Sequence, residues 1–415
     1  MNLPINGRVV VIDDVQGEGF PLLKLFSQNG IPVSYFTGVK EELPASPISG
    51  VRVIFLDIIL GTESQSEKTK ISTVANVVTH IVGSSKNTPY IIIAWTKHRE
   101  LKDKIKDALK SNPPLMMLDL KKDDCKNSKG EYDLNIIKNR LKEEMTKSGV
   151  FQLFLIWENL VHQSANGIVE GFTGFYAKDG DWNKNMFCVF KKLAEAYAGK
   201  KLMAGKLSDI FVNSLLTFNM TFLDTLENEI KCCKYPDKLR GLRNKNIPDE
   251  KIIASVNTKL LLADNKDNKS MQPGNVYEGS IGRVKVAGLF DGDIDKYQNK
   301  ADLISKAKPI YAEVSPICDY TCDKLKLHRI LPGFLWPVDH IKKVNRKADY
   351  IYTSPLFLIG ADKYYLVFDV RYLTSLPLST HKKNKKLMFK LKHELLTDIQ
   401  AHLANHINRP GVIKI

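Results

Sequence analysis

Acidic and hydroxyl side chains follow three apolar runs in the N-terminal part of the sequence. Asp13 and Asp14 come directly after the first run. Asp57 ends a later run, and Thr96 ends the next one. Carboxylates gathered at one place repel one another and need a cation, and oxygen ligands with open water positions suit Mg²⁺. An ionised aspartate can also attack a phosphoryl donor when a metal ion or a lysine neutralises the phosphoryl oxygens. These residues therefore predict a Mg²⁺ site beside a carboxylate nucleophile.

The elements that must bring these side chains together are apolar runs rich in β-branched residues. Runs of this kind predict strands that are buried on both faces, and helical patterns lie between them. Strands alternating with helices predict an α/β fold with a doubly wound parallel sheet, in which ligands bind beyond the carboxyl ends of the strands. The five predicted strands cover residues 8–12, 31–36, 51–56, 90–94 and 115–120.

With these residues at its strand ends, the N-terminal third of the chain resembles a response-regulator receiver domain of the CheY-like class. In that family an acidic pair and a phosphorylated aspartate hold Mg²⁺, and a hydroxyl and a lysine contact the phosphoryl group. The resemblance implies that Asp57 is the phosphoacceptor, that Thr96 is the switch hydroxyl and that Lys121 is the lysine. It also implies that Asp13 and Asp14 are the acidic metal-binding pair and that Ile59 offers its backbone carbonyl to the metal.

Three departures from the family pattern leave an alternative open. Lys121 is followed by Lys122 instead of proline, so that Lys122 is a second candidate for the functional lysine. Residues 115–118 offer no aromatic switch residue, and the polar stretch 61–69 lengthens the connection after Asp57. The alternative is a pseudo-receiver, which keeps the fold and binds a partner without being phosphorylated.

The sequence pattern after the receiver-like segment changes twice. Aromatic and aliphatic residues at helical spacing predict a helical domain over residues 149–265, after a receiver-like domain at 1–148. A Pro-Gly turn and alternating apolar residues then predict a β-rich α+β module over 271–415, which ends in an amphipathic helix.

The C-terminal module contains one cluster of residue types that could bind a metal. Cys318, Cys322 and His328 could supply three zinc ligands, with Asp319 beside them. A structural zinc site normally has four ligands, and no second Cys/His pair lies nearby in the sequence. Zinc is therefore a weaker prediction than Mg²⁺, and the module shows no convincing catalytic motif beyond this cluster.

Positive charge is concentrated after residue 150. The whole chain carries a formal net charge of +15, of which only +3 belongs to residues 1–150. The densest lysine cluster precedes the C-terminal helix and predicts salt-dependent, non-specific contact with the phosphates of DNA or RNA. The alternative is a solvated helix start. The lysines of this cluster are Lys382, Lys383, Lys385 and Lys386.

Composition excludes several classes of protein. Hydrophobic residues make up 43% of the chain, and no apolar run reaches the length of about 18–20 residues that a membrane span needs. The first residues show no basic segment followed by an apolar core, and six cysteines in 415 residues do not form a disulfide scaffold. We expect a cytoplasmic multidomain protein with no membrane partner.

A second resemblance concerns the whole chain. The stretches 313–324, 368–373 and 408–411 resemble a group of bacterial proteins with an atypical N-terminal receiver, encoded beside histidine-kinase/Hsp90-type ATPases in phage-defence loci. This implies a response-regulator-like protein of a two-component or anti-phage defence system, switched by phosphorylation of Asp57 or by docking of the ATPase. Trp95 would then be either an exposed interface anchor or a core residue. A pseudo-receiver scaffold and a non-specific nucleic-acid-binding effector remain alternatives.

Overall fold

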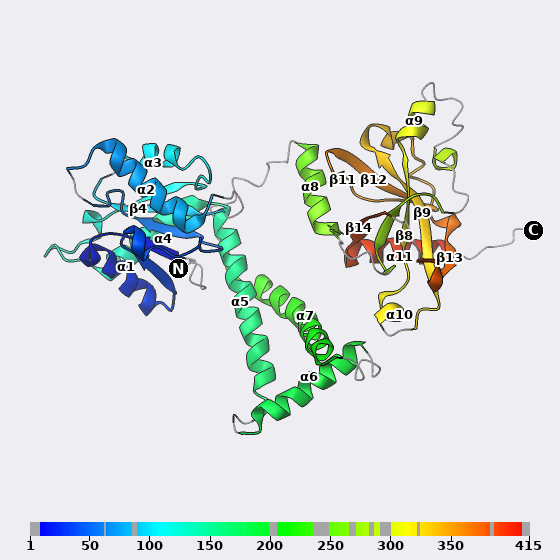
Figure 1. Ribbon diagram of the computed structural model, residues 1–415, viewed down its shortest axis with the longest axis horizontal. Helices are drawn as coiled ribbons and strands as arrows, with labels where there is room; N and C mark the ends of the chain where they lie inside the picture. Colours follow the sequence, from blue (N-terminus) through cyan, green and yellow to red (C-terminus); the bar gives the residue numbers. More distant parts are fainter. Residues whose placement is uncertain are drawn as a thin grey trace, which may run out of the picture. The chain divides into compact units, whose positions relative to one another are not determined.

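The computed structural model of the chain divides into two compact units. The first comprises Met1–Tyr197 and Leu207–Asn244, and the second comprises Ala198–Lys206 and Lys245–Ile415 (Figure 1). The residues that the structure describes are 9–61, 64–84, 89–98, 100–176, 178, 180–198, 206–235, 249–264, 271–281, 286–290, 300–321, 324–381 and 386–408.

The first unit contains a parallel sheet of five strands in the order β2-β1-β3-β4-β5. This order places β1 and β3 side by side at the centre, so the two aspartate-bearing strand ends are neighbours. The predicted parallel sheet is confirmed, and it is consistent with a receiver-like α/β fold. The strands are β1 (Val9–Ile12), β2 (Val33–Phe36), β3 (Val53–Leu56), β4 (Ile91–Thr96) and β5 (Met117–Lys121).

Two apolar cores, one on each face, explain why β1, β3 and β4 are buried along their whole length. Alternate side chains of β1 point to opposite faces, so Val11 packs in one core and Ile12 in the other. Helices cover both faces of the sheet (Figure 1). The first core includes residues of α1 (Gln16–Gln28), α4 (Leu134–Met145) and α5 (Phe151–Thr173), and the second includes residues of α2 (Glu67–Val82) and α3 (Lys102–Ala108).

Helix α5 lies within the predicted helical domain 149–265, but its first turns pack in the core of the parallel sheet. Phe151 and Leu155 belong to the same core as the sheet strands. Arg52, just before β3, binds the Glu158 carboxylate with an Nη2–Oε1 distance of 2.6 Å. The first turns of α5 are therefore fixed to the sheet. The other long helices of this unit are α6 (Trp182–Ala198) and α7 (Leu207–Cys232).

The second unit is built on an antiparallel sheet, as the predicted β-rich module requires. Its strand order is β10-β12-β9-β8-β7-β14-β6, with β11 paired to β12 and β13 paired to β9. The strands are β6 (Leu262–Ala263), β7 (Asn275–Glu278), β8 (Lys308–Glu313), β9 (Leu327–Pro337), β10 (Ile351–Thr353), β11 (Phe357–Ile359), β12 (Asp362–Asp369), β13 (Thr374–Pro377) and β14 (Leu387–Leu391).

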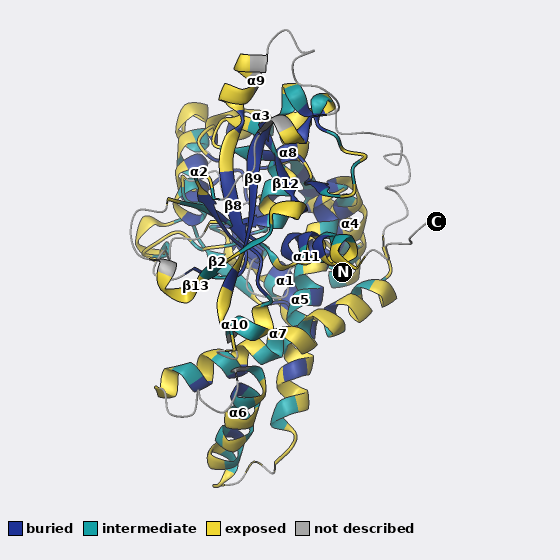
Figure 2. Cartoon of the chain, turned by 90° about the vertical axis from the view of Figure 1, so that its right-hand side faces the viewer, coloured by how far each residue is buried: buried dark blue, intermediate teal, exposed yellow. Residues whose placement is uncertain are grey.

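Strands β8 and β9 carry much of the buried surface of this sheet (Figure 2). Gly333 of β9 lies where a Cβ atom would meet the Val367 carbonyl oxygen at 2.4 Å, so only glycine allows β12 to approach so closely. Four buried residues of α11 pack in the core of this sheet, as the predicted amphipathic helix implies. The helices are α8 (Glu250–Leu261), α9 (Lys300–Lys306), α10 (Ile317–Thr321) and α11 (His393–Ile407).

Helix α8 lay inside the predicted helical domain 149–265, but it packs on the C-terminal sheet. Asn257 Nδ2 donates to the Leu356 carbonyl at 3.0 Å, and the Leu358 backbone N–H donates to Thr258 Oγ1 at 2.9 Å. The second unit therefore begins before residue 271. Among the helices in the described part of the chain, none combines the length and apolar character needed to cross a membrane.

Candidate functional site

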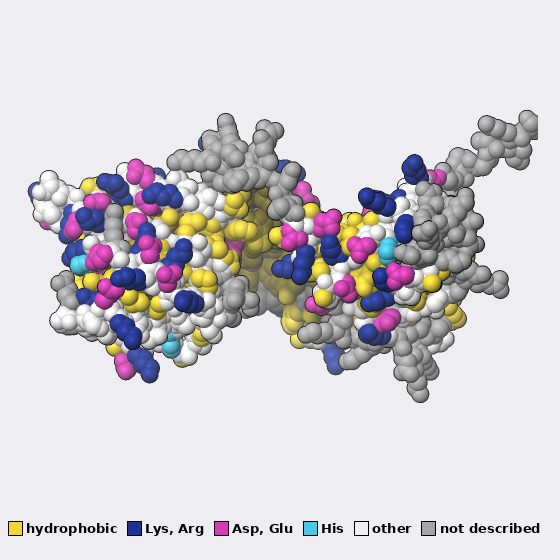
Figure 3. Space-filling view, turned by 90° about the horizontal axis from the view of Figure 1, so that it is seen from above, with side chains coloured by type: hydrophobic (Ala, Val, Ile, Leu, Met, Phe, Trp, Pro, Cys, Tyr) yellow, Lys and Arg dark blue, Asp and Glu magenta, His cyan; other side chains and the backbone are white. Residues whose placement is uncertain are grey.

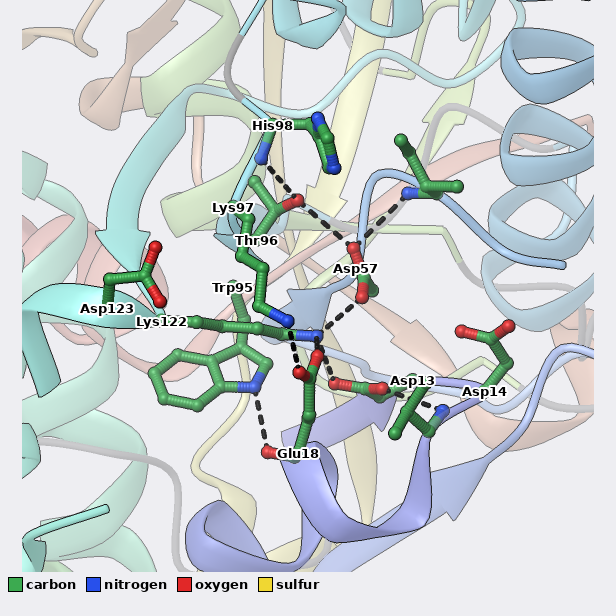
Figure 4. Close-up of polar contacts among 12 residues, drawn as sticks. Asp13, Asp14, Glu18, Asp57, Trp95, Thr96, Lys97, His98, Lys122 and Asp123 are labelled. Atoms are coloured by element: carbon green, nitrogen blue, oxygen red, sulfur yellow. Dashed lines mark hydrogen bonds and ion pairs between the residues drawn. The ribbon is translucent and has the colours of Figure 1, made fainter. Parts of the chain in front are cut away.

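The carboxyl ends of β1, β3 and β4 place three of the predicted residues at one edge of the N-terminal sheet (Figure 4). Backbone hydrogen bonds extend the strand pairing to the first two of them. The Asp13 N–H donates to the Phe36 carbonyl at 3.1 Å, and the Asp57 N–H donates to the Ile12 carbonyl at 2.8 Å. The positions of Asp13 and Asp57 are thus set by the sheet and not by a free loop.

Three carboxylates converge at this edge. One oxygen from each of Asp13, Asp14 and Asp57 lies within 4.8 Å of the other two, and among the described residues no other group of three His, Cys, Asp or Glu side chains does so. Asp13 and Asp57 are buried, whereas Asp14 is half-buried and accepts a hydrogen bond from the Gly61 N–H at 2.8 Å. The predicted acidic cluster is present.

The lysine that reaches this cluster is Lys122, which corrects the prediction of Lys121. Lys122 Nζ lies 2.5 Å from Asp57 Oδ2 and 2.9 Å from Asp13 Oδ2. Lys121 is the last residue of β5 and pairs in register with Thr96. Lys122, however, continues the two-residue spacing of the buried side chains Leu118 and Leu120. Side chains alternate along a strand, so a shift of one residue exchanges the inward and outward lysines.

Burial and ion pairing oppose each other in this cluster. Burial raises the pKa of Asp13 to about 6, although Lys122 acts to lower it. Burial alone would lower the pKa of Lys122, but the charges of Asp57 and Asp13 outweigh that effect and raise it. Lys122 is therefore a buried ammonium whose charge is balanced by carboxylates, as a buried cation requires.

Asp57 is held in one orientation by groups on both of its oxygens. Thr96 Oγ1 donates to Asp57 Oδ1 at 3.1 Å, and the Ile59 N–H donates to the same oxygen at 3.2 Å. Thr96 Oγ1 also accepts a hydrogen bond from the His98 N–H at 3.1 Å. The predicted hydroxyl is thus in contact with the predicted phosphoacceptor, while the Ile59 carbonyl remains a predicted metal ligand.

The residues of this cluster fit a magnesium ion. Asp13 Oδ2 lies 2.9 Å from Lys122 Nζ, and an ionised carboxylate has further lone pairs that a cation shared with Asp14 and Asp57 can use. Carboxylate oxygens with room for water are the ligand set that Mg²⁺ prefers. The cluster opens into a cavity of about 120 Å³ lined by Asp14, Val15, Glu18, Asp57, Ile59, Gly61, Lys97 and His98.

Glu18 is the site residue that the sequence reasoning missed. It lies in the first turn of α1, and its Oε2 is 2.6 Å from Lys122 Nζ. The available signal was its spacing, because a residue one helical turn beyond Asp14 returns to the same edge of the sheet. The backbone carbonyl of Glu18 accepts a hydrogen bond from Trp95 Nε1 at 3.0 Å. Trp95 is fully buried, so of the two predicted roles it has the core role.

The candidate residues of the C-terminal module do not form a comparable site. Cys318 is exposed on α10 with Asp319, whereas His328 is buried in β9 with its Nδ1 3.3 Å from Glu313 Oε1. Within the described part of the chain these three do not form a metal-ligand group. Cys322 lies outside the described residues, so the predicted zinc site gains no support.

Of the predicted polyanion-binding lysines, only Lys386 is described. It is exposed, and its Nζ lies 2.8 Å from Glu278 Oε2, so part of its charge is already matched. Lysine, arginine and acidic side chains are interspersed on the face of the molecule in Figure 3. On the described residues visible in this view, no extended field of one sign is present. Lys382, Lys383 and Lys385 lie outside the described residues.

Comparisons with known proteins find no match, so the function must be inferred from the geometry of the site. None of the known protein families matches the chain in a family scan. A search of curated proteins likewise finds no similar sequence.

Proposed function

We propose that this chain is a response-regulator-like protein of the receiver class whose Asp57 accepts a phosphoryl group. The observation that carries the proposal is the environment of Asp57 at the edge of a five-stranded parallel sheet (Figure 4). Thr96 and Lys122 bind its two oxygens, and Asp13 and Asp14 lie within reach of a shared cation. All of the groups that aspartyl phosphorylation requires are present.

The chemistry follows from these contacts. An oxygen of the Asp57 carboxylate attacks the phosphorus atom of the donor and forms an O–P bond. The bond from phosphorus to the leaving group breaks, and its electron pair departs with that group, which is acetate when acetyl phosphate is the donor. Asp13, Asp14 and Asp57 would hold Mg²⁺, which when bound neutralises charge on the phosphoryl oxygens.

The chain's own residues act on the product. Lys122 supplies a buried positive charge beside the new acyl phosphate. The hydroxyl of Thr96 can turn from Asp57 Oδ1 to a phosphoryl oxygen, and this rotation would weaken its contact with the His98 N–H. Phosphorylation would thereby be transmitted to the segment after β4 as a change in local packing.

The test is intact-mass spectrometry after incubation with acetyl phosphate and Mg²⁺. Wild type should gain the mass of one phosphoryl group, and Asp57→Asn should gain none. Asp119→Asn is a matched control, because Asp119 lies on β5 of the same sheet but pairs with Lys102 at 2.8 Å. Equal labelling of wild type and Asp57→Asn would exclude Asp57. No labelling under conditions that modify an ordinary receiver would support the pseudo-receiver.

The proposed partner is an ATPase of the histidine-kinase/Hsp90 type, which would read the segment after Thr96. Support comes from the sequence resemblance and from the hydrogen bond that couples Thr96 to His98. A partner that bound both states equally would shift no equilibrium, so its affinity must differ between them. Co-purification should therefore differ between wild type, Asp57→Asn and Thr96→Ala. Equal recovery with all three would leave docking without switching.

A further inference from the structure

The carboxylate of Glu18 is shared by two lysines. Lys122 Nζ lies 2.6 Å from Glu18 Oε2, and Lys97 Nζ lies 2.5 Å from Glu18 Oε1 (Figure 4). Burial alone would raise the pKa of Glu18, but its hydrogen bonds to the two ammonium groups outweigh this and lower it. Glu18 is therefore an ionised residue, and each of its oxygens is occupied by a lysine.

Lys97 belongs to the same cavity as the phosphoacceptor. Lys97, Glu18 and Asp57 all line the cavity described above, and Lys97 follows Thr96 directly in the sequence. The Lys97 side chain is 44% exposed, whereas that of Glu18 is 19% exposed. The more exposed partner of this ion pair is thus the cation, which has the freedom to reach into the cavity.

The backbone of Glu18 is the fixed part of the arrangement. Its carbonyl is bound by the indole N–H of Trp95, and the Trp95 ring packs against Tyr132 with centroids 5.5 Å apart. Trp95 itself is fully buried. A new anion in the cavity would therefore draw the exposed Lys97 side chain toward itself while the backbone of Glu18 stayed in place.

The charges explain why a second lysine is needed. Phosphorylation replaces the single charge of the Asp57 carboxylate with up to about two negative charges on the phosphoryl group, in a cavity that also contains the carboxylates of Asp14 and Glu18. Lys122 is already engaged by Asp13 and Asp57, and a bound Mg²⁺ would also face the carboxylates of Asp13 and Asp14, so a further cation helps to balance the added charge. Lys97 is the lysine among the residues that line the cavity, and it shares the Glu18 carboxylate with Lys122.

We propose that the Glu18 carboxylate forms ion pairs with Lys97 and Lys122 until a phosphoryl group on Asp57 displaces it. Lys97 is then the second lysine that binds the phosphoryl group. The inference rests on the proposed function of Asp57 and adds that the ion pairs of Glu18 regulate phosphoryl binding there. Glu18 competes with the incoming anion for both lysines, so it weakens phosphoryl binding. Lys97 strengthens the same binding. Changes at the two ends of one ion pair should therefore act in opposite directions.

The test is titration of the full-length chain with beryllium fluoride in the presence of Mg²⁺, as a stable mimic of the phosphoryl group on Asp57. Glu18→Gln should bind the mimic about tenfold more tightly, and Lys97→Met about tenfold more weakly, as expected for one partly screened charge. Lys97→Arg keeps the positive charge and should lose less affinity than Lys97→Met. Rates of labelling by acetyl phosphate should change in the same directions.

A matched control pair is available on the same unit. Lys104 and Glu67 form an exposed ion pair, and neither residue lines the cavity of Asp57. Glu67→Gln and Lys104→Met should leave the affinity for the mimic unchanged. Misfolding would weaken binding in every variant, so it does not produce a gain in Glu18→Gln together with a loss in Lys97→Met.

The outcomes separate this inference from the proposed function. Unchanged affinity in Lys97→Met, or a loss in both Glu18→Gln and Lys97→Met, would overturn the inference while wild type still became labelled on Asp57. If wild type neither bound the mimic nor took up a phosphoryl group, the proposed function would fail and the inference would fall with it.

Discussion

Each of the two units buries a cluster of polar side chains, and the two clusters differ in the groups that pair with their carboxylates. The N-terminal cluster comprises Asp13, Asp57 and Lys122, and the C-terminal cluster comprises Glu313, Ser315 and His328. Both contain a fully buried or nearly buried carboxylate beside a basic side chain. Burial of charge is therefore common to both and does not by itself identify a site.

The C-terminal cluster satisfies its own polar groups. Glu313 accepts hydrogen bonds from the Ser315 hydroxyl and from the Ser315 N–H, the latter at 3.2 Å, and His328 lies beside the same carboxylate. Ser315 Oγ in turn accepts from the Arg329 N–H at 3.0 Å. This arrangement ties β8 to β9. The N-terminal cluster is also ion-paired, with Asp13 Oδ2 2.9 Å from Lys122 Nζ, but its Asp57 lines a cavity. The cavity beside Asp57 is the feature that makes the N-terminal cluster the candidate site.

The largest expected effect is on Lys122. Lys122→Met removes the buried cation of the N-terminal cluster and leaves its carboxylates facing one another, which should destabilise the first unit by about 3 kcal/mol in EDTA. Mg²⁺ should restore part of this loss by binding the same carboxylates. Hydrogen–deuterium exchange of peptides covering β1 and β3 measures the local free energy of unfolding.

Lys121→Met is the control for this comparison, since Lys121 lies outside the cluster. It should change the local free energy of unfolding by less than about 0.5 kcal/mol. Equal effects at the two positions would contradict the assignment of Lys122 as the lysine of the site.

The next effect concerns the C-terminal cluster. Glu313→Ala leaves the Ser315 hydroxyl and the His328 ring without their acceptor, and we expect a loss of about 2 kcal/mol in the second unit. Exchange in β8 and β9 should rise, and labelling of Asp57 should stay at the wild-type level. A loss of Asp57 labelling in Glu313→Ala would show that this cluster takes part in function as well as in folding.

A smaller effect is expected for Thr96→Ala. It removes one neutral-to-charged hydrogen bond to Asp57 and the acceptor of the His98 N–H, which should cost about 1 kcal/mol. Thr96→Ser keeps the hydroxyl and should behave as wild type. Exchange of the peptide that contains Thr96 and His98 measures both variants, and similar exchange in the two would show that the hydroxyl has no role.

The smallest effect on folding is expected at the C-terminal lysines. Replacing Lys382, Lys383, Lys385 and Lys386 with glutamine should leave stability within about 0.5 kcal/mol. Any DNA or RNA binding should weaken, and its salt dependence should flatten by about one unit of slope for each phosphate that the variant no longer neutralises. Filter binding over a salt series measures both quantities. Unchanged retention at low salt would assign these lysines to a solvated surface.

Much of the N-terminal site could be predicted because buried parallel strands end abruptly where polar residues begin. Asp13, Asp57 and Thr96 stand at those boundaries, and parallel pairing brings the boundaries to one edge. The choice between Lys121 and Lys122 could not be made in this way. It depends on which face each residue of β5 presents, and the apolar run at 115–120 begins two residues before that strand does.

Other features of the fold and of the site could not be predicted, because they depend on contacts between segments far apart in the sequence. Glu18 gains its role only when α1 places its first turn beside Lys122, and the pairing of Glu313 with His328 requires β8 and β9 to be neighbours. Helix α8 has the apolar spacing of any amphipathic helix, so its sequence does not show that it packs on the C-terminal sheet.

The attachment of helix α5 has a mechanical consequence. Its 23 residues span about 34 Å at the usual helical rise, and only its beginning is embedded in the core of the parallel sheet. The ion pair between Arg52 and Glu158 braces it near that base. Beyond this base, Ile156 and Leu160 of α5 pack against Leu226 of α7, so a tilt of α5 would carry α7 with it. A tilt of about 5° at the base displaces the far end by about 3 Å, so a repacking too small to alter the sheet becomes a shift of atomic size at α6.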